Sequence, residues 1–259
     1  MECGSSCVYA DDLNAMGEES QYRPEKLEKK IKEQGDKIEN TLQKLLLMMN
    51  NDKTQFIVCT HSQRRKASRL SFEERKKREA KIVTEIGGET ITEGSEVRTL
   101  GVKFDSYLRF EPYWREVRGK IMKKLYGLKQ IKSHLTFRQR KQLGSSLVIS
   151  RLSYCIEATS CCTKSVLNIP KRVLNRTTRV VTNNWDYDDT KQNYKSLAWM
   201  ELDELVVWRT YKMAKKMLVK GNPQKMLRRM ATKSNDTWEI DPPKNHRTKL
   251  GRRSFTSRV

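Results

Sequence analysis

Long apolar segments are missing from this sequence of 259 residues. The longest apolar run, residues 45–49, is much shorter than the roughly 20 apolar residues that a membrane-spanning helix needs. Residues 1–6 also lack the basic and apolar parts of a secretory signal. The sequence therefore predicts a protein that makes no membrane contact and is located inside the cell, in the cytoplasm or the nucleus.

Cysteine and histidine are too few and too scattered to indicate a zinc site. The cysteines show no paired zinc spacing, and only three histidines are present. An intracellular chain keeps its thiols reduced, so we expect buried free thiols. The six cysteines are Cys3, Cys7, Cys59, Cys155, Cys161 and Cys162.

Acidic residues are scarce in the second half of the chain. The net charge is +22, and residues 111–185 carry 16 Lys or Arg against only 3 Asp or Glu. Residues 220–259 add 11 bases against 3 acids, whereas residues 1–110 are nearly balanced, with 20 bases and 19 acids. Such an excess repels itself unless a polyanion neutralises it, so we expect a polyanionic partner; the alternative is a merely solvated basic surface.

A short motif near the start carries the most specific chemistry. Val8-Tyr9-Ala10-Asp11-Asp12 is an apolar run that ends in two adjacent carboxylates. Neighbouring side chains of a strand point to opposite faces, so both aspartates can serve one site only if the chain turns there. Asp favours turns, which predicts a hairpin with residues 3–9 and 13–16 as its strands and Asp11-Asp12 at its tip. Paired carboxylates at a tip suit Mg²⁺, although a surface turn with two aspartates is also ordinary.

The first 110 residues are predicted to form an α+β unit. Arg23-Pro24-Glu25 begins an amphipathic helix that the polar residues 50–52 end. Gly35 is a weak point in this helix. Its apolar face is expected to pack on a sheet. Residues 61–81 are expected to be an exposed linker or a solvated helical turn. Gly87-Gly88 suits a tight hairpin turn, and β-branched and aromatic residues predict strands at residues 55–59, 82–86, 89–91 and 97–104.

Beyond Pro112 the sequence is predicted to be helical. An apolar stripe at helical spacing covers residues 117–131, and basic side chains cover much of the remaining surface. Thr136 suits the N-cap of a second helix that extends to Leu152. A third helix lies near residues 166–181, where Pro170 begins or interrupts it, and a fourth covers residues 199–218 with Tyr211 on its apolar side. The last twenty residues have no clear period and are expected to be loosely ordered.

Seven short segments stand out together by their order and spacing. They are residues 9–12, 51–54 and 97–105, followed by residues 121–129, 151–155, 174–181 and 251–255. Together they resemble the reverse transcriptase of non-LTR retrotransposons of the jockey type. The first three resemble its later palm and the others its thumb and the segment beyond, and the likeness extends over most of the chain.

The resemblance implies an α+β fold with a particular organisation. Residues 1–110 would form an incomplete polymerase palm, built from a hairpin, a helix and short antiparallel strands. Residues 111–185 would form a basic, thumb-like helical bundle. Residues 186–259 would form a helical C-terminal extension with a loosely ordered basic tail.

The resemblance also implies a chemistry, in which the hairpin aspartates hold Mg²⁺ for two-metal nucleotidyl transfer. Asp11 would be the main metal ligand and Asp12 its supporter, while Lys53 would lie beside the incoming deoxynucleoside triphosphate. RNA template and DNA primer would be held without base readout. Taken alone, Lys53 also suits a solvated turn, and Leu100 and Gly101 suit core or packing positions. The expected nucleic-acid contacts are Tyr9, Leu100 and Gly101 in the palm, and Lys120, Lys123, Lys124, Lys171, Arg172, Arg176 and Arg179 in the helices.

One departure from the family bears on activity. The family's palm needs a further metal-binding aspartate and the fingers upstream of the hairpin, and only eight residues precede Tyr9. We therefore expect a fragment of an RNA-directed DNA polymerase, from a truncated element or a partial gene model, that is inactive alone. The alternative is a non-catalytic, basic nucleic-acid-binding module in which the aspartates are a relic. A third expectation is poor folding, because a palm without its first strands exposes a sheet edge.

Overall fold

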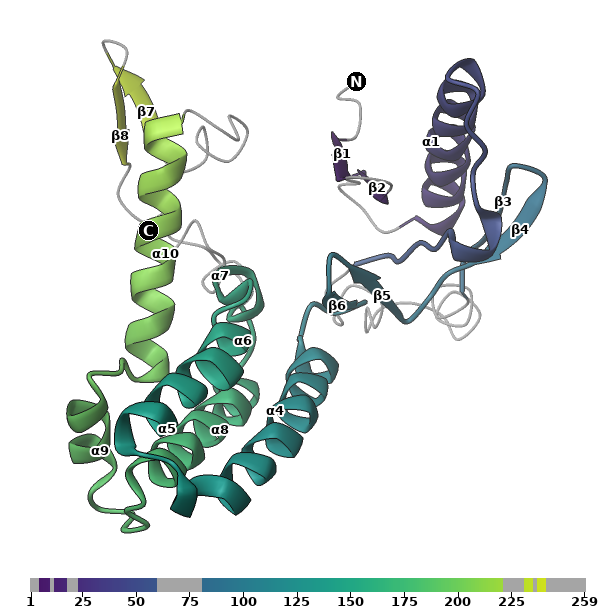
Figure 1. The fold of residues 1–259 in the computed structure, drawn as a ribbon. Coiled ribbons are helices and arrows are strands. Elements are labelled where there is room, and N and C mark those ends of the chain that lie inside the picture. The colour runs from purple at the N-terminus through teal and green to yellow at the C-terminus, as the bar shows by residue number, and fades with distance from the viewer. Residues whose placement is uncertain are drawn as a thin grey trace, which may run out of the picture. The chain divides into compact units, whose positions relative to one another are not determined.

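The computed structural model describes residues 5–9, 12–17, 23–59, 81–220, 231–234 and 237–240. It divides the chain into two compact units, Met1–Leu108 and Arg109–Val259. The described residues form a mixed α+β structure in which helices predominate and all strands pair as antiparallel hairpins (Figure 1). The α+β fold class is therefore confirmed at this level, while the limits expected at residues 110 and 185 stay predictions.

The first unit begins with the hairpin that the acidic motif predicts. Strands β1 (Ser5–Tyr9) and β2 (Asp12–Met16) are antiparallel, with Tyr9 directly opposite Asp12. Residues 10 and 11, which join the two strands, lie outside the described residues. The prediction places Asp12 at the tip, whereas the structure has it as the first residue of β2.

The long helix α1 (Pro24–Lys44) begins at the proline that predicts it. It ends before the expected residues 50–52, and the apolar run that follows is outside the helix, with Leu46 and Met48 almost fully exposed. Gly35 is the buried residue of this helix, and a Cβ added to it would lie 2.7 Å from Cγ2 of Ile86. The predicted weak point is therefore a place where α1 packs closely against a strand.

Two small hairpins follow in the first unit. Strands β3 (Val83–Ile86) and β4 (Glu89–Thr92) are joined by Gly87-Gly88, both with positive φ, as the sequence predicts. Strands β5 (Glu96–Thr99) and β6 (Val102–Asp105) form another. The expected single strand at residues 97–104 is wrong, because Leu100 (φ 47°) and Gly101 (φ 79°) turn the chain between them.

Residues 55–59 also differ from the expectation of a strand. They follow a short 3₁₀ turn, η1 (Asn51–Lys53), and have no assigned strand. Phe56 accepts a hydrogen bond from the Gly94 amide (3.0 Å) instead of entering a regular ladder. Residues 60–80, which include most of the expected linker, lie outside the described residues.

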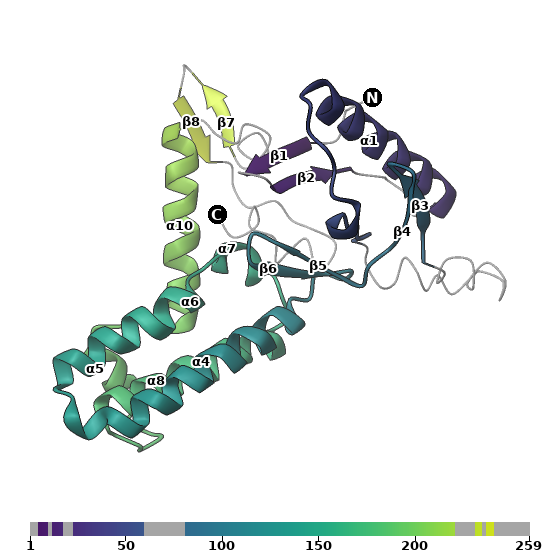
Figure 2. The same ribbon diagram turned by 45° about the vertical axis from the view of Figure 1, so that its right-hand side comes forward.

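The second unit is a helical bundle followed by a hairpin. Its long helices are α4 (Glu111–Ile131), α8 (Lys164–Thr182) and α10 (Leu202–Lys220), and the views agree that α4 and α8 lie side by side (Figure 2). The shorter elements are η2 (Lys132–His134), α5 (Phe137–Gly144), the π-helical η3 (Ser145–Ile149), α6 (Ser150–Leu152), α7 (Ile156–Thr159), α9 (Thr190–Leu197), β7 (Ala231–Ser234) and β8 (Thr237–Ile240).

The core of this unit lies where α4 packs on α8. Leucines of α4 and valines of α8 bury each other and Leu197 of α9. Trp114, only 1 % exposed, fixes the start of α4, because its indole N–H donates to the Thr159 carbonyl oxygen (3.2 Å). Burial also raises the pKa of the neighbouring Tyr113 to about 12. The other members of the core cluster are Leu125, Leu128, Val180 and Val181.

Several details of the helical predictions are confirmed and others are wrong. Thr136 caps α5 in a reciprocal capping box with Gln139. Pro170 lies inside α8, so it does not begin this helix. The helix begins at Lys164, and Thr163 caps it. Tyr211 is 64 % exposed and Ile131 is 48 % exposed, so both lie outside the apolar faces to which the spacing assigned them.

Other expectations concern cysteines and membranes. Of the four cysteines whose side chains are described, Cys162 is buried, Cys155 and Cys161 are half-buried and Cys59 is exposed, so burial is not general. None of the helices described here is both long and apolar enough to span a bilayer. The final residues 241–259 lie outside the described part.

The close approach of Gly35 to Ile86 makes a testable prediction. Gly35→Ala should lower the free energy of unfolding of the first unit by about 1–3 kcal/mol, because the new methyl group overpacks this contact. Gly119→Ala on α4 is the matched control, because a Cβ added there would meet nothing within 4 Å. This substitution should raise the free energy of unfolding of the second unit by about 0.5–1 kcal/mol. Native-state hydrogen exchange reports on each unit separately. A stabilised Gly35→Ala variant would contradict the close packing.

Candidate nucleic-acid interface

The acidic hairpin presents one described carboxylate. Asp12 is exposed at the start of β2, and Tyr9 is its partner in the ladder. Asp11 lies outside the described residues. Within the described ranges, no group of three or more His, Cys, Asp or Glu could hold a metal ion. An exposed carboxylate fits the oxygen ligands of Mg²⁺, which often binds one or two carboxylates together with substrate phosphates.

Lys53 lies in a different part of the first unit from the hairpin strands. It ends the turn η1, where its side chain is exposed and its amide donates to the Asn50 carbonyl oxygen (3.2 Å). Asp12 and Lys53 form no ion pair or hydrogen bond with each other in the part of the chain that is described. These two predicted catalytic residues are therefore not brought into contact.

Leu100 and Gly101 form the turn of the β5–β6 hairpin. Both have positive φ, and the Leu100 side chain is 41 % exposed. A leucine in the left-handed region is strained, whereas glycine tolerates it. The turn thus presents the Leu100 side chain to the solvent. Leu100 is therefore not in the core position that the sequence offered as the alternative to a nucleic-acid contact.

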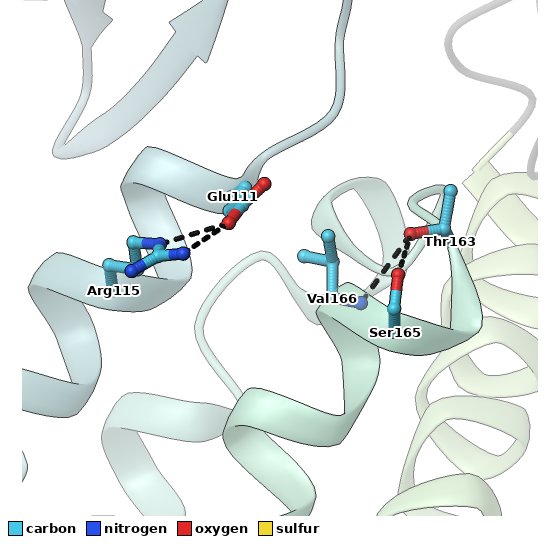
Figure 3. Close-up of polar contacts among 5 residues, drawn as sticks. All are labelled: Glu111, Arg115, Thr163, Ser165 and Val166. Carbon is cyan, nitrogen blue, oxygen red and sulfur yellow. Dashed lines mark hydrogen bonds and ion pairs between the residues drawn. The ribbon is translucent and has the colours of Figure 1, made fainter.

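The basic side chains of α4 divide into compensated and uncompensated ones. Arg115 donates to Glu111 through two nitrogens at the start of the helix, and Lys120 forms an ion pair with Glu116 (2.6 Å) (Figure 3 shows the first pair). Lys123 and Lys124 are exposed and have no carboxylate partner among the described residues. Of the three lysines predicted on α4, these two are available to bind phosphate.

Three arginines of α8 lie on one side of the helix. Arg172, Arg176 and Arg179 are four and three residues apart, and the buried face of α8 is on the opposite side. Arg172 and Arg176 are exposed and lack a carboxylate partner within the described residues. Arg179 is half-buried and its guanidinium lies 3.7 Å from the ring centroid of Tyr187. Figure 3 shows how this helix begins, with the Thr163 hydroxyl accepting from the Val166 amide (3.4 Å).

Lys171 differs from its predicted neighbours because it is paired. Its ammonium donates to the Asp203 carboxylate at the start of α10 (2.7 Å). This hydrogen bond raises the pKa of Lys171. The pair is largely exposed, so it contributes little to stability, but it lowers the positive charge that Lys171 offers to a ligand.

Aromatic residues between α8 and α9 extend the basic surface and were missed from the sequence. Trp185, 41 % exposed, has Lys129 of α4 at 5.1 Å and Lys132 at 5.8 Å from its ring centroid. Tyr187 lies under Arg179 in the same way. The sequence around these aromatics is acidic, so it does not predict a basic surface. The lysines that approach Trp185 belong to a different part of the chain.

Comparison with known proteins gives no relative. No protein-family model matches the chain, and neither curated proteins nor solved structures yielded a match.

The ion pair between Lys171 and Asp203 predicts a gain of binding. Asp203→Asn removes an acid and frees Lys171, so it should tighten binding to duplex nucleic acid and steepen the salt dependence of log Kd by about 0.9. Fluorescence anisotropy over a series of salt concentrations measures both. Glu28→Gln on α1 is the control with the same charge change at an exposed position outside this surface. Equal effects of the two substitutions would mean that only net charge matters.

Proposed function

We propose that the chain is the later palm and thumb of an RNA-directed DNA polymerase of the non-LTR retrotransposon type. The observation that carries this proposal is the β1–β2 hairpin, in which Tyr9 ends one strand and Asp12, its ladder partner, begins the other. The motif and the downstream segments occur in the order of that family, and the same chain carries a basic helical bundle. RNA template, DNA primer and deoxynucleoside triphosphates are the proposed ligands.

The aspartates would be the metal ligands of such a polymerase. Asp11 and Asp12 would hold Mg²⁺, which activates the primer hydroxyl and stabilises the triphosphate when two ions are bound. Asp12 is exposed and has no cationic partner within the described residues, so its oxygens are open to a metal ion. The resemblance requires a further carboxylate for the full site, and we assign no catalytic step to the described residues alone.

The basic helices would hold the template–primer duplex. Lys123 and Lys124 of α4 and Arg172 and Arg176 of α8 are exposed cations on two helices that pack together. Cations of this kind neutralise phosphates and carry no base specificity, which is what a polymerase that copies any sequence needs.

Metal binding tests the polymerase proposal. Asp11→Asn/Asp12→Asn should weaken Mn²⁺ binding by at least about tenfold in the presence of a nucleoside triphosphate, because carboxylate oxygens are strong ligands for hard cations and amide oxygens are weak ones. Electron paramagnetic resonance of free Mn²⁺ measures this. Asp186→Asn/Asp188→Asn changes the same charge in another exposed acidic pair. If both variants bind Mn²⁺ like the wild type, the hairpin is not a metal site.

Primer extension completes this test. On an RNA template with a DNA primer and Mg²⁺, we expect no incorporation above background, since the two aspartates alone do not supply both ion sites. Robust incorporation that disappears in Asp11→Ala would show that the chain completes its own site.

A second candidate function is non-catalytic nucleic-acid binding. It is favoured by the exposed cations of α4 and α8, which have no carboxylate partners within the described residues. In this case, the aspartates are a relic, and Asp11→Asn/Asp12→Asn leaves both metal and nucleic-acid binding unchanged.

Both candidates predict salt-dependent duplex binding through α8. Arg172→Gln/Arg176→Gln should weaken binding to an RNA–DNA hybrid and lower the slope of log Kd against log salt by about 1.8, because each phosphate that an arginine neutralises adds about 0.9 to the slope. Anisotropy titrations measure the slope. Lys26→Gln/Lys29→Gln on α1 removes the same charge elsewhere and should change the slope much less. Affinity that does not vary with salt would contradict both functions.

A further inference from the structure

Helix α10 carries a second basic surface that the sequence did not indicate, because acids and bases balance over residues 186–219. The structure separates them. The acids Asp203 and Glu204 lie in the first turn of the helix, whereas every charged residue from position 209 to its end is a base. These bases are Arg209, Lys212, Lys215, Lys216 and Lys220.

Four of these cations line a hollow of about 410 Å³. Among the described residues that line it, one is acidic: Glu157 is neutralised by Arg209, whose Nε lies 3.0 Å from Oε1 of the carboxylate. Lys212, Lys216 and Lys220 have no carboxylate partner within the described residues. They recur every four residues, so they follow one side of the helix at intervals of about 6 Å. The hollow is therefore lined by a row of ammonium groups that no described carboxylate neutralises.

One exposed aromatic side chain, Trp208, lies beside this row, and Tyr211 follows it three residues later, on the neighbouring part of the helix surface farther from the lysines. Trp208 is 42 % exposed and Tyr211 is 64 % exposed, although both belong to a helix that has a buried face. The Lys212 ammonium lies 4.9 Å from the centroid of the Trp208 ring, so one residue borders both the hollow and the aromatic surface. Favourable interaction with the helix dipole explains lysines near the end of α10, but it does not explain exposed aromatic rings.

We propose that this face of α10 binds single-stranded nucleic acid. Phosphates would lie along Lys212, Lys216 and Lys220, and unpaired bases would stack on Trp208 and Tyr211. A duplex keeps its base faces stacked internally, whereas a single strand offers them to aromatic side chains. The uncompensated charge of the hollow selects a polyanion over an acid-poor protein surface or a second copy of this basic chain.

This surface is separate from the duplex-binding residues proposed on α4 and α8. The inference shares with the proposed function only the idea that the chain binds nucleic acid, and the two are tested with different ligands and on different helices. A single strand beside a duplex is the form of a template that has not yet been copied, or of a displaced strand.

Binding of labelled oligothymidine to the full chain tests the lysines. Lys216→Gln/Lys220→Gln should lower the slope of log Kd against log salt by about 1.4, because each neutralised phosphate of a single strand adds about 0.7 to the slope. Lys191→Gln/Lys195→Gln on α9 removes the same charge from another exposed helix and should leave the slope nearly unchanged. Equal decreases in the two variants would overturn the site in favour of a general charge effect.

The aromatic residues are tested with a matched tyrosine. Tyr211→Ala should weaken oligothymidine binding at least about fivefold, whereas Tyr126→Ala, at a similarly exposed position on α4, should leave it unchanged. Neither should alter binding to the RNA–DNA hybrid. If Tyr211→Ala leaves oligothymidine binding intact, or instead abolishes self-association seen by sedimentation, the proposal is wrong. Failure of Arg172→Gln/Arg176→Gln to affect the hybrid would count against the α8 surface alone.

Discussion

The packing of α4 against α8 is the constraint on which the second unit depends. Leu125 and Leu128 are at most 3 % exposed because they face Val180 and Val181. Once this stripe is fixed, helical geometry determines which positions face the solvent. On α4 and α8 those positions are mostly Lys and Arg, so the basic exterior is a consequence of how the core packs.

Cations crowded on one surface repel each other unless something nearby compensates their charge. The structure shows three kinds of compensation. Carboxylates placed one helical turn away neutralise Arg115 and Lys120. Lys171 is paired across helices. Arg179 and Lys129 lie over aromatic rings, which attract cations without neutralising them. Uncompensated cations remain on α4, α8 and α10, among other described helices, and a polyanion that binds there would relieve their repulsion.

Local chemistry explains what could be predicted from the sequence. The Gly87-Gly88 hairpin and the Thr136 capping box depend on residues close together in the chain, and both are present. Residues 97–104 were misassigned because β-branched residues on both sides of Leu100 favour a strand, and a leucine at positive φ gives no turn signal. Spacing along one helix cannot specify contacts with residues far away in the chain. The approach of Gly35 to Ile86 and that of two lysines to Trp185 are contacts of this kind. Spacing also cannot show that Tyr211 is exposed, with no described element packed over it.

The acidic hairpin could be predicted in outline but not completed as a site. Asp12 is one exposed carboxylate at the start of a strand, and a lone carboxylate in water holds Mg²⁺ weakly. Magnesium sites of nucleotide-handling proteins commonly obtain their remaining oxygen ligands from substrate phosphates. In the proposed polymerase the hairpin would depend on its ligand, because phosphate oxygens from a bound triphosphate or polynucleotide would leave Asp11 and Asp12 to supply only part of the coordination. Without a bound polyanion, Asp12 is an ordinary exposed carboxylate at the start of a strand.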